Sequence, residues 1–143
     1  TGLVFLPTDP AVADGVISTI EDVVVEEGLR VLGWRDVPTD ASMLGAQALA
    51  GMPAFRQIFV EGDAAAGLDL ERRAFMLRKR IEHTVGGLDD GGCYIPSLSS
   101  RTFVYKGMLI PDQLAAFLPP LELAGDAELV GEGQHVLAVR VVG

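Results

Sequence analysis

The chain has 143 residues, the usual length of one domain, and its 20 acidic residues against 11 lysines and arginines give a net charge of −9. This charge disfavours nucleic acid and membrane surfaces as partners, because phosphate groups repel an acidic protein. Acidic residues interrupt the longest apolar stretch, Ala11 to Val25, so no segment reaches the about 20 apolar residues that span a bilayer. A single cysteine excludes an internal disulfide and favours a cytoplasmic location.

The first predicted elements are a strand and a helix. Gly2 to Leu6 is a short apolar run that predicts a buried strand, and it lacks the charged segment that precedes the apolar part of a signal peptide. Asp9 followed by Pro10 is typical of a helix start, and Gly28 of a helix end. Apolar residues recur at helical spacing between them. They are Val12, Val16, Ile20, Val23 and Val24.

Two further strands are predicted over Arg30 to Val37 and Phe55 to Val60, where apolar residues are concentrated. Between them, Pro38 to Ala50 predicts a turn and a short helix that starts near Thr39 or Asp40. Asp63 to Gly67 has small, flexible residues and predicts a connecting loop.

The second long helix is predicted over Leu70 to Val85, and Gly86 to Gly92 predicts a loop after it. Cys93 to Leu98 and Thr102 to Tyr105 predict two strands joined as a hairpin at Ser99-Ser100-Arg101. The apolar side of the helix is expected to consist of Leu70, Phe75, Leu77, Ile81 and Val85.

A last helix is predicted from Pro111 through Phe117, ended by Pro119-Pro120, and a last strand over His135 to Val142. This order of elements predicts a mixed α/β arrangement of the α+β class, with antiparallel pairing at least in the hairpin.

Few residues of this chain are typical of catalytic or metal sites. Cys93 begins an apolar strand with no base or cation beside it, so a buried structural cysteine is the favoured interpretation. His83 and His135 are expected to be surface or packing residues, since two histidines and one cysteine do not provide a histidine-rich metal site. The serines Ser97, Ser99 and Ser100 lack the Gly-x-Ser-x-Gly pattern of a nucleophile, and a polar hairpin turn explains them better.

The glycine-rich loop is also better explained by structure than by chemistry. Asp89-Asp90 lacks the ligand spacing of a calcium loop, and no Lys-Ser/Thr follows the glycines as in a phosphate-binding loop. Taken alone, these residues predict a soluble α/β domain and do not indicate a function.

Two stretches of the sequence resemble a known family. They are Val31-Leu-Gly-Trp-Arg-Asp-Val-Pro38 and Tyr94-Ile-Pro-Ser-Leu-Ser-Ser-Arg-Thr-Phe-Val-Tyr-Lys-Gly-Met-Leu109. Both closely resemble segments of the class II glutamine amidotransferase domain of glutamate synthase large subunits. The resemblance extends over about residues 1–118. Other matching segments, in the family's order, are Gly2 to Pro7, Leu44-Gly45, Pro53, Gln57 to Val60 and Arg78 to Glu82.

The resemblance implies a fold and a reaction. The fold is a four-layer αββα sandwich of the N-terminal-nucleophile type, with largely antiparallel sheets. In the family, an N-terminal cysteine attacks the side-chain amide of glutamine, assisted by its own α-amino group. The released ammonia reaches a synthase domain, where 2-oxoglutarate is aminated and reduced to glutamate. The FMN and the iron–sulfur cluster of these oxidoreductases belong to other domains, so no cofactor is expected in this segment.

The sequence also departs from the family. The opening Cys-Gly-Val-Gly-Phe is not found before Thr1, and the later Arg-Phe-Ser-Thr-Asn and His-Asn-Gly-Glu-Ile-Asn segments are not found either. Pro96 replaces what is usually a cysteine, so its strand is expected to lie at a sheet edge or to be disturbed. We therefore expect a partial amidotransferase domain over residues 1–121 and a divergent tail over 122–143.

These departures lead to the functional hypotheses. No catalytic residue is expected in the chain, Arg101 is a candidate for lining the glutamine pocket, and no metal ligand is predicted. The first hypothesis is a glutaminase fragment that is inactive alone, with the rest of a glutamate synthase, or another copy of this chain, as partner. An alternative is a non-catalytic α/β module that binds a small molecule or protein. A third is complementation by segments from another chain.

Overall fold

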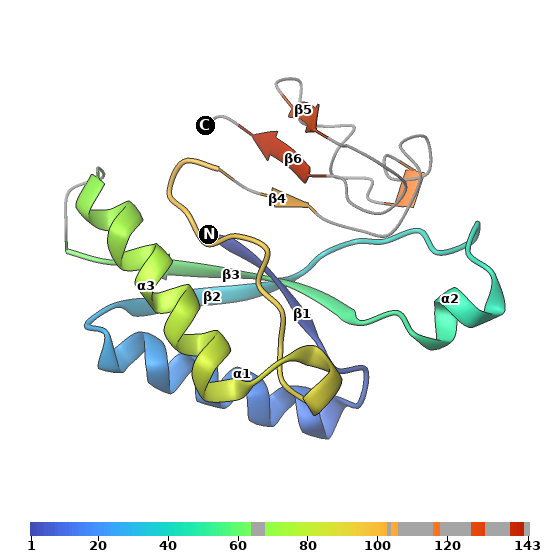
Figure 1. The fold of residues 1–143 in the computed structure, drawn as a ribbon, viewed down its shortest axis with the longest axis horizontal. Coiled ribbons are helices and arrows are strands. Elements are labelled where there is room, and N and C mark those ends of the chain that lie inside the picture. Colours follow the sequence, from blue (N-terminus) through green and yellow to red (C-terminus); the bar gives the residue numbers. More distant parts are fainter. Residues whose placement is uncertain (64–67, 103, 106–115, 118–126, 131–137, 142–143) are drawn as a thin grey trace.

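A computed structural model describes residues 1–63, 68–102, 104–105, 116–117, 127–130 and 138–141 (Figure 1). Two antiparallel sheets and two long helices dominate this part of the chain. In chain order, the elements are β1 (Gly2–Leu6), α1 (Pro10–Glu26), β2 (Arg30–Asp36), α2 (Ala46–Ala50), β3 (Ala54–Glu61), α3 (Leu68–Val85), a 3₁₀ turn (Leu88–Asp90), β4 (Val104–Tyr105), β5 (Ala127–Val130) and β6 (Ala138–Val141).

Strand β1 is paired on both of its edges. On one edge it pairs with β3 in antiparallel register, Gly2 opposite Ile58 and Leu6 opposite Ala54, and β3 in turn pairs with β2. On the other edge it forms isolated antiparallel bridges, Gly2 to Leu98 and Phe5 to Tyr94. All five residues of β1 are buried, and successive side chains enter two different clusters. Both faces of this strand are therefore covered.

Helix α1 begins and ends where its sequence predicts. The Asp9 carboxylate accepts a hydrogen bond from the Ala11 N–H (2.9 Å), and Pro10 occupies the first turn. The chain leaves the helix through Gly28, whose φ of 72° is a left-handed conformation that suits glycine. The Trp34 indole N–H donates to Glu21 (2.9 Å), which fixes the helix against β2.

Helix α3 covers the same face of the first sheet as α1. Its Ala74, Leu77 and Ile81 are buried in the larger core cluster, together with Val4 and Leu6 of β1 and the buried side of α1. The predicted apolar side of α3 is wrong at Phe75, which is largely exposed between the cations of Arg78 and Lys79.

A second cluster fills the opposite face of the first sheet. Phe5, Phe55 and Tyr94 meet edge to face there, and Phe117 joins them through a ring centroid 5.7 Å from that of Phe55. Strands β4, β6 and β5 form a second antiparallel sheet, which lies on the other side of the first sheet from α1 (Figure 1). The mixed α/β class with antiparallel sheets is thus confirmed, and the order of helices, sheet and sheet is consistent with the N-terminal-nucleophile fold.

The predicted hairpin is wrong. Residues 93–98 form only two bridges to β1, with a bend at Pro96, because proline cannot donate to a strand ladder. Strand β4 pairs with β6 and not with this segment. The Pro96 carbonyl instead accepts a hydrogen bond from the Arg78 guanidinium (2.8 Å). The segment is locally disturbed at Pro96, one of the two expected alternatives.

The short helix also begins later than predicted. Asp40 accepts a hydrogen bond from the Ser42 N–H (3.0 Å) in a local turn, and α2 starts only at Ala46. Strand β6 lies within the predicted strand, and β5 was not predicted. Most of the predicted loop over Asp63 to Gly67 and of the last predicted helix, with His135, lies outside the described residues. No helix in the described ranges combines the length and the hydropathy needed to cross a membrane.

The core predicts that substitutions at two neighbouring residues of α3 change the free energy of unfolding by very different amounts. Leu77 is 1% exposed and Met76 is 60% exposed. Leu77→Ala should lower the free energy of unfolding by about 2–5 kcal/mol, because it removes buried methyl groups and leaves a cavity. Met76→Ala is the control and should change it by less than about 0.5 kcal/mol. Urea unfolding of both variants checks this, and similar losses would contradict the assigned helix face.

Candidate functional site

The serines of the resemblance stretch build a turn that is anchored to α3. The Ser99 hydroxyl donates to Glu71 Oε2 (2.7 Å), and both the N–H (2.7 Å) and the hydroxyl of Ser100 donate to Oε1. The Ser99 oxygen also accepts hydrogen bonds from the N–H groups of Arg101 and Thr102, at 3.0 and 3.1 Å. The predicted role of these serines in a polar turn is confirmed, although the turn does not close a hairpin.

Glu71 is ionised in this arrangement. Desolvation by itself would raise the pKa of its carboxyl group, but the hydrogen bonds from Ser100 and Ser99 and the charge of Arg101 together lower the pKa below its usual value. Sequence reasoning missed Glu71, since its partners lie 28 and 29 residues further along the chain and no local pattern connects them.

Arg101 lies on the outside of this turn. Its side chain is exposed, and its charge acts on Glu71. It lines neither of the two pockets described next. The structure therefore presents Arg101 to solvent on an anchored turn, and its assignment to a glutamine pocket stays a prediction.

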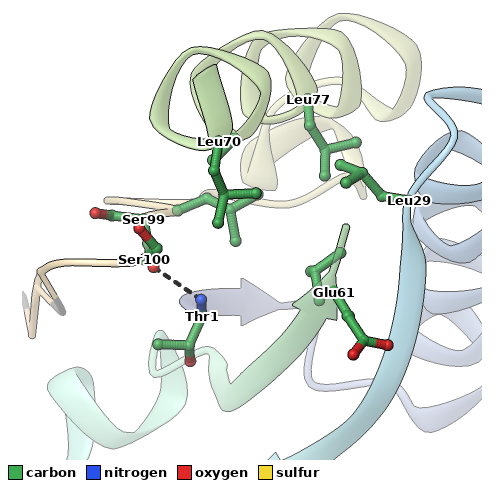
Figure 2. A pocket seen from close by; sticks show the side chains of 10 residues that line it. Thr1, Leu29, Glu61, Leu70, Leu77, Ser99 and Ser100 are labelled. Carbon is green, nitrogen blue, oxygen red and sulfur yellow. Dashed lines mark hydrogen bonds between the residues drawn. The ribbon is translucent and has the colours of Figure 1, made fainter. Parts of the chain in front are cut away.

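A small pocket lies between α3 and the ends of β1 and β3 (Figure 2). Leu29, Leu70 and Leu77 point into it, and the Thr1 nitrogen donates to the Ser99 carbonyl (2.8 Å) at its edge. Its volume of ≈ 40 Å³ is enough for a few water molecules but not for a glutamine molecule. This pocket is a packing gap under the Ser99 turn.

A larger groove of ≈ 430 Å³ runs between the C-terminal half of α3 and residues 93–96. Its size falls within the range of small-molecule sites. Its charges are already paired with one another, because Lys79 contacts Glu82 (3.1 Å) and Arg78 lies 3.8 Å from the same carboxylate. The groove thus offers little unpaired charge for recognising a ligand.

Cys93 lies at this groove, but its thiol is not activated. The residue is 2% exposed, and burial, followed by the negative charge of Glu82, raises the pKa of the thiol to about 11. Its backbone is held by a hydrogen bond to the Gly86 carbonyl (3.1 Å), and a Cβ on the neighbouring Gly92 would lie only 2.2 Å from that oxygen. The prediction of a structural cysteine is confirmed.

The structure also bears on the predictions for the two histidines and for a metal site. His83 is exposed on α3, as expected, whereas His135 lies outside the described part of the chain. Within the described ranges, no group of three or more acidic, histidine or cysteine side chains is placed to hold a metal ion.

The chain belongs to the class II glutamine amidotransferases, whose family pattern matches residues 1–128. Among its curated relatives are glutamate synthases: the ferredoxin-dependent enzyme 2 of Arabidopsis thaliana is 40% identical over 125 residues, covering 85% of this chain. The large chain of the NADPH enzyme of Bacillus subtilis is 36% identical over 125 residues, also covering 85%. The chain spans 8% of the length of either relative. The predicted resemblance is confirmed.

The Glu71 anchor predicts a pH-dependent contribution to stability. Because the pKa of Glu71 is lower in the folded chain than its ordinary value of 4.5, the contribution is present above that pH and is lost as the pH falls through the folded-state pKa. Glu71→Gln should cost about 1 kcal/mol at pH 7, a modest value since solvent screens the site, and less at pH 3.

Urea unfolding at the two pH values measures this difference. Asp89→Asn, which changes an exposed carboxylate on the 3₁₀ turn, is the control and should have little effect at either pH. An equal cost of Glu71→Gln at pH 3 and pH 7 would contradict the ionised anchor.

Cys93 should resist thiol reagents as long as the chain is folded. At pH 7.5 a buried thiol with a pKa of about 11 is almost entirely protonated and out of contact with solvent. We expect modification by a chromogenic disulfide to be at least about a hundredfold slower than in 6 M guanidinium, where the same cysteine is exposed. Equal rates would show that Cys93 is accessible.

Proposed function

We propose that this chain forms part of the glutaminase domain of a glutamate synthase. The observation that carries the proposal is the similarity to glutamate synthases along 85% of the chain, together with the class II amidotransferase match over residues 1–128. The helix, sheet and sheet order of the described residues supports it.

The proposed parent enzyme makes glutamate from glutamine and 2-oxoglutarate. Its glutaminase domain releases ammonia from the glutamine side chain, and the synthase region, which holds FMN and an iron–sulfur cluster, incorporates that ammonia into 2-oxoglutarate. We further propose a role in ammonia assimilation and a cytoplasmic location. The rest of the synthase is the proposed partner of this segment.

We propose that this segment supports the fold of the domain and holds the 97–101 turn in position, without taking part in the reaction itself. Its only cysteine is buried and protonated, so the segment contributes no activated thiol of its own. What it contributes is an antiparallel sheet covered by α1 and α3, with the 97–101 turn hydrogen-bonded to Glu71 of α3. We therefore expect the chain to be inactive as a glutaminase by itself.

Arg101 is the proposed substrate contact within this segment. An exposed guanidinium on an anchored turn suits a carboxylate, because its planar fork of donors matches two carboxylate oxygens. The α-carboxylate of glutamine is such a group. Because the turn is already ordered by Glu71 and Ser99, little conformational freedom is lost when a ligand binds there.

A chimeric enzyme tests the function. Residues 1–121 replace the matching segment of the Bacillus subtilis glutamate synthase large chain, and glutamine-dependent glutamate formation is measured. Activity within about tenfold of the parent is expected, and a folded but inactive chimera would contradict the proposal. In the active chimera, Arg101→Ala should raise the KM for glutamine by about tenfold or more through a lost charged hydrogen bond, whereas the exposed control Arg72→Ala should leave it unchanged.

The isolated chain provides a second test. We expect no ammonia release from glutamine above the uncatalysed rate, either from the unmodified chain or from Cys93→Ala. Release that disappears in Cys93→Ala would contradict the supporting role assigned to this segment.

A further inference from the structure

A short chain of hydrogen bonds crosses the first sheet on the face opposite the helices. Gln57 of β3 lies opposite Leu3 of β1 on one side and opposite Arg35 of β2 on the other. Its Nε2 donates to the Thr1 hydroxyl (2.7 Å), and its Oε1 accepts a hydrogen bond from the Arg35 guanidinium. Gln57 is only 7% exposed, whereas Arg35 is exposed. A buried amide thus holds an exposed guanidinium in place.

The positive charge of Arg35 has no acidic partner within the described ranges. Its hydrogen bond there goes to the neutral amide of Gln57, and a guanidinium has further N–H donors in the same plane. The other positively charged side chains with a described partner contact carboxylates or backbone carbonyls, and they are Arg30, Arg56, Arg73, Arg78, Lys79 and Arg80. In a chain with a net charge of −9, an oriented cation without an acidic partner suits an anionic ligand.

The face of β2 next to Arg35 is open. The register shift in β2 ends at Gly33, so Gly33 and Arg35 alternate regularly with Trp34 and lie on the same face. A Cβ added to Gly33 would meet no described atom within 4 Å. Phe59 of β3 lies opposite Gly33 and is partly exposed. A small ligand therefore has space over Gly33, with an aromatic residue on one side and a cation on the other.

We propose that Gly33, Arg35 and Phe59 form a binding site for a small organic carboxylate. The planar guanidinium donates to both carboxylate oxygens, and the carbon chain of the ligand lies over Gly33 against Phe59. Gln57 is a positioning residue, because its hydrogen bond orients the guanidinium before the ligand arrives and reduces the freedom lost on binding. One cation suits a single negative charge, since the second charge of a phosphate would face an acidic chain.

This site is separate from the substrate contact proposed for Arg101. Strands β3 and β1 lie between β2 and the segment that leads into the 97–101 turn. Neighbouring strands are about 4.8 Å apart, which puts about 14 Å between the two backbones. The site near Arg35 is tested by ligand binding alone, so its test does not depend on glutaminase activity.

An NMR titration of the ¹⁵N-labelled full chain tests the site. Glutarate is added at constant ionic strength, and the backbone N–H signals of Gly33, Arg35 and Phe59 are followed. We expect saturation with a dissociation constant on the order of 1 mM, because a single exposed charged contact gives weak binding. Glutaramide, which replaces both carboxylates by neutral amides, should bind about tenfold more weakly or worse. Acetate should also bind more weakly than glutarate, since it lacks the chain that lies over Gly33.

Titrations with 2-oxoglutarate and L-glutamine, the carboxylates of the proposed reaction, distinguish two sources of the ligand. Both acids should compete with glutarate, and the tighter of the two identifies the preferred ligand. Chloride and inorganic phosphate serve as anion controls and should shift the three signals much less.

Four variants assign the binding to these residues. Arg35→Gln should weaken glutarate binding by about tenfold or more. Gly33→Val should do the same by filling the space, and it should keep the fold because its Cβ meets nothing and its φ is not left-handed. Gln57→Glu places a carboxylate against Arg35 and should also weaken binding, although the arginine is still present. Arg30→Gln, on the same strand but paired with Glu61, is the matched control and should bind normally.

Dispersed N–H signals show that each variant is folded, so a lost site is distinguished from a lost fold. The absence of saturable shifts with all of these acids would overturn the proposal. Unchanged affinity in Arg35→Gln, or equal shifts with chloride or phosphate, would overturn it as well. Normal binding by Gly33→Val would contradict the placement of the ligand over this face of β2.

Discussion

The structure depends on the complete enclosure of β1. This strand has hydrogen-bonding partners on both edges, β3 on one and residues 94–99 on the other. Val4 and Leu6 face the two helices, while Leu3 and Phe5 face the aromatic cluster. Because both cores meet at one strand, the helix layer and the opposite layer share a single support, and a change in β1 affects both at once.

The elements that the sequence predicts well are those specified by local chemistry. Asp9, Pro10 and Gly28 set the ends of α1 through a cap, a preset φ and a left-handed exit, all within a few residues. The hairpin was wrong because strand pairing is decided by distant partners: β4 pairs with β6, more than 30 residues further on. Phe75 was misplaced because two neighbouring cations make an exposed aromatic ring favourable, which the spacing of apolar residues does not reveal.

In the candidate site too, a local motif was recognised in the sequence, whereas its partners on distant elements were not. The Ser-Leu-Ser-Ser-Arg-Thr stretch identified the family, but its partner Glu71 was invisible because it lies on another element. Arg78 likewise gives the Pro96 carbonyl a hydrogen bond outside the ladder. Through these two residues α3 is attached to both ends of the segment that carries Arg101, so the helix controls how that segment is presented.

The pairing of β1 has a consequence for how the chain folds. Its partners lie far along the sequence: Gly2 pairs with Ile58, Phe5 with Tyr94, and Thr1 with Ser99. Long loops must close before these contacts form, which is typical of slow folding. During synthesis, the apolar run from Leu3 to Leu6 leaves the ribosome before its partners and stays without its second edge until about a hundred further residues have followed, several seconds at ordinary translation rates. The nascent chain therefore carries this apolar segment without its partners during that interval, so a chaperone that binds short apolar segments has a target there.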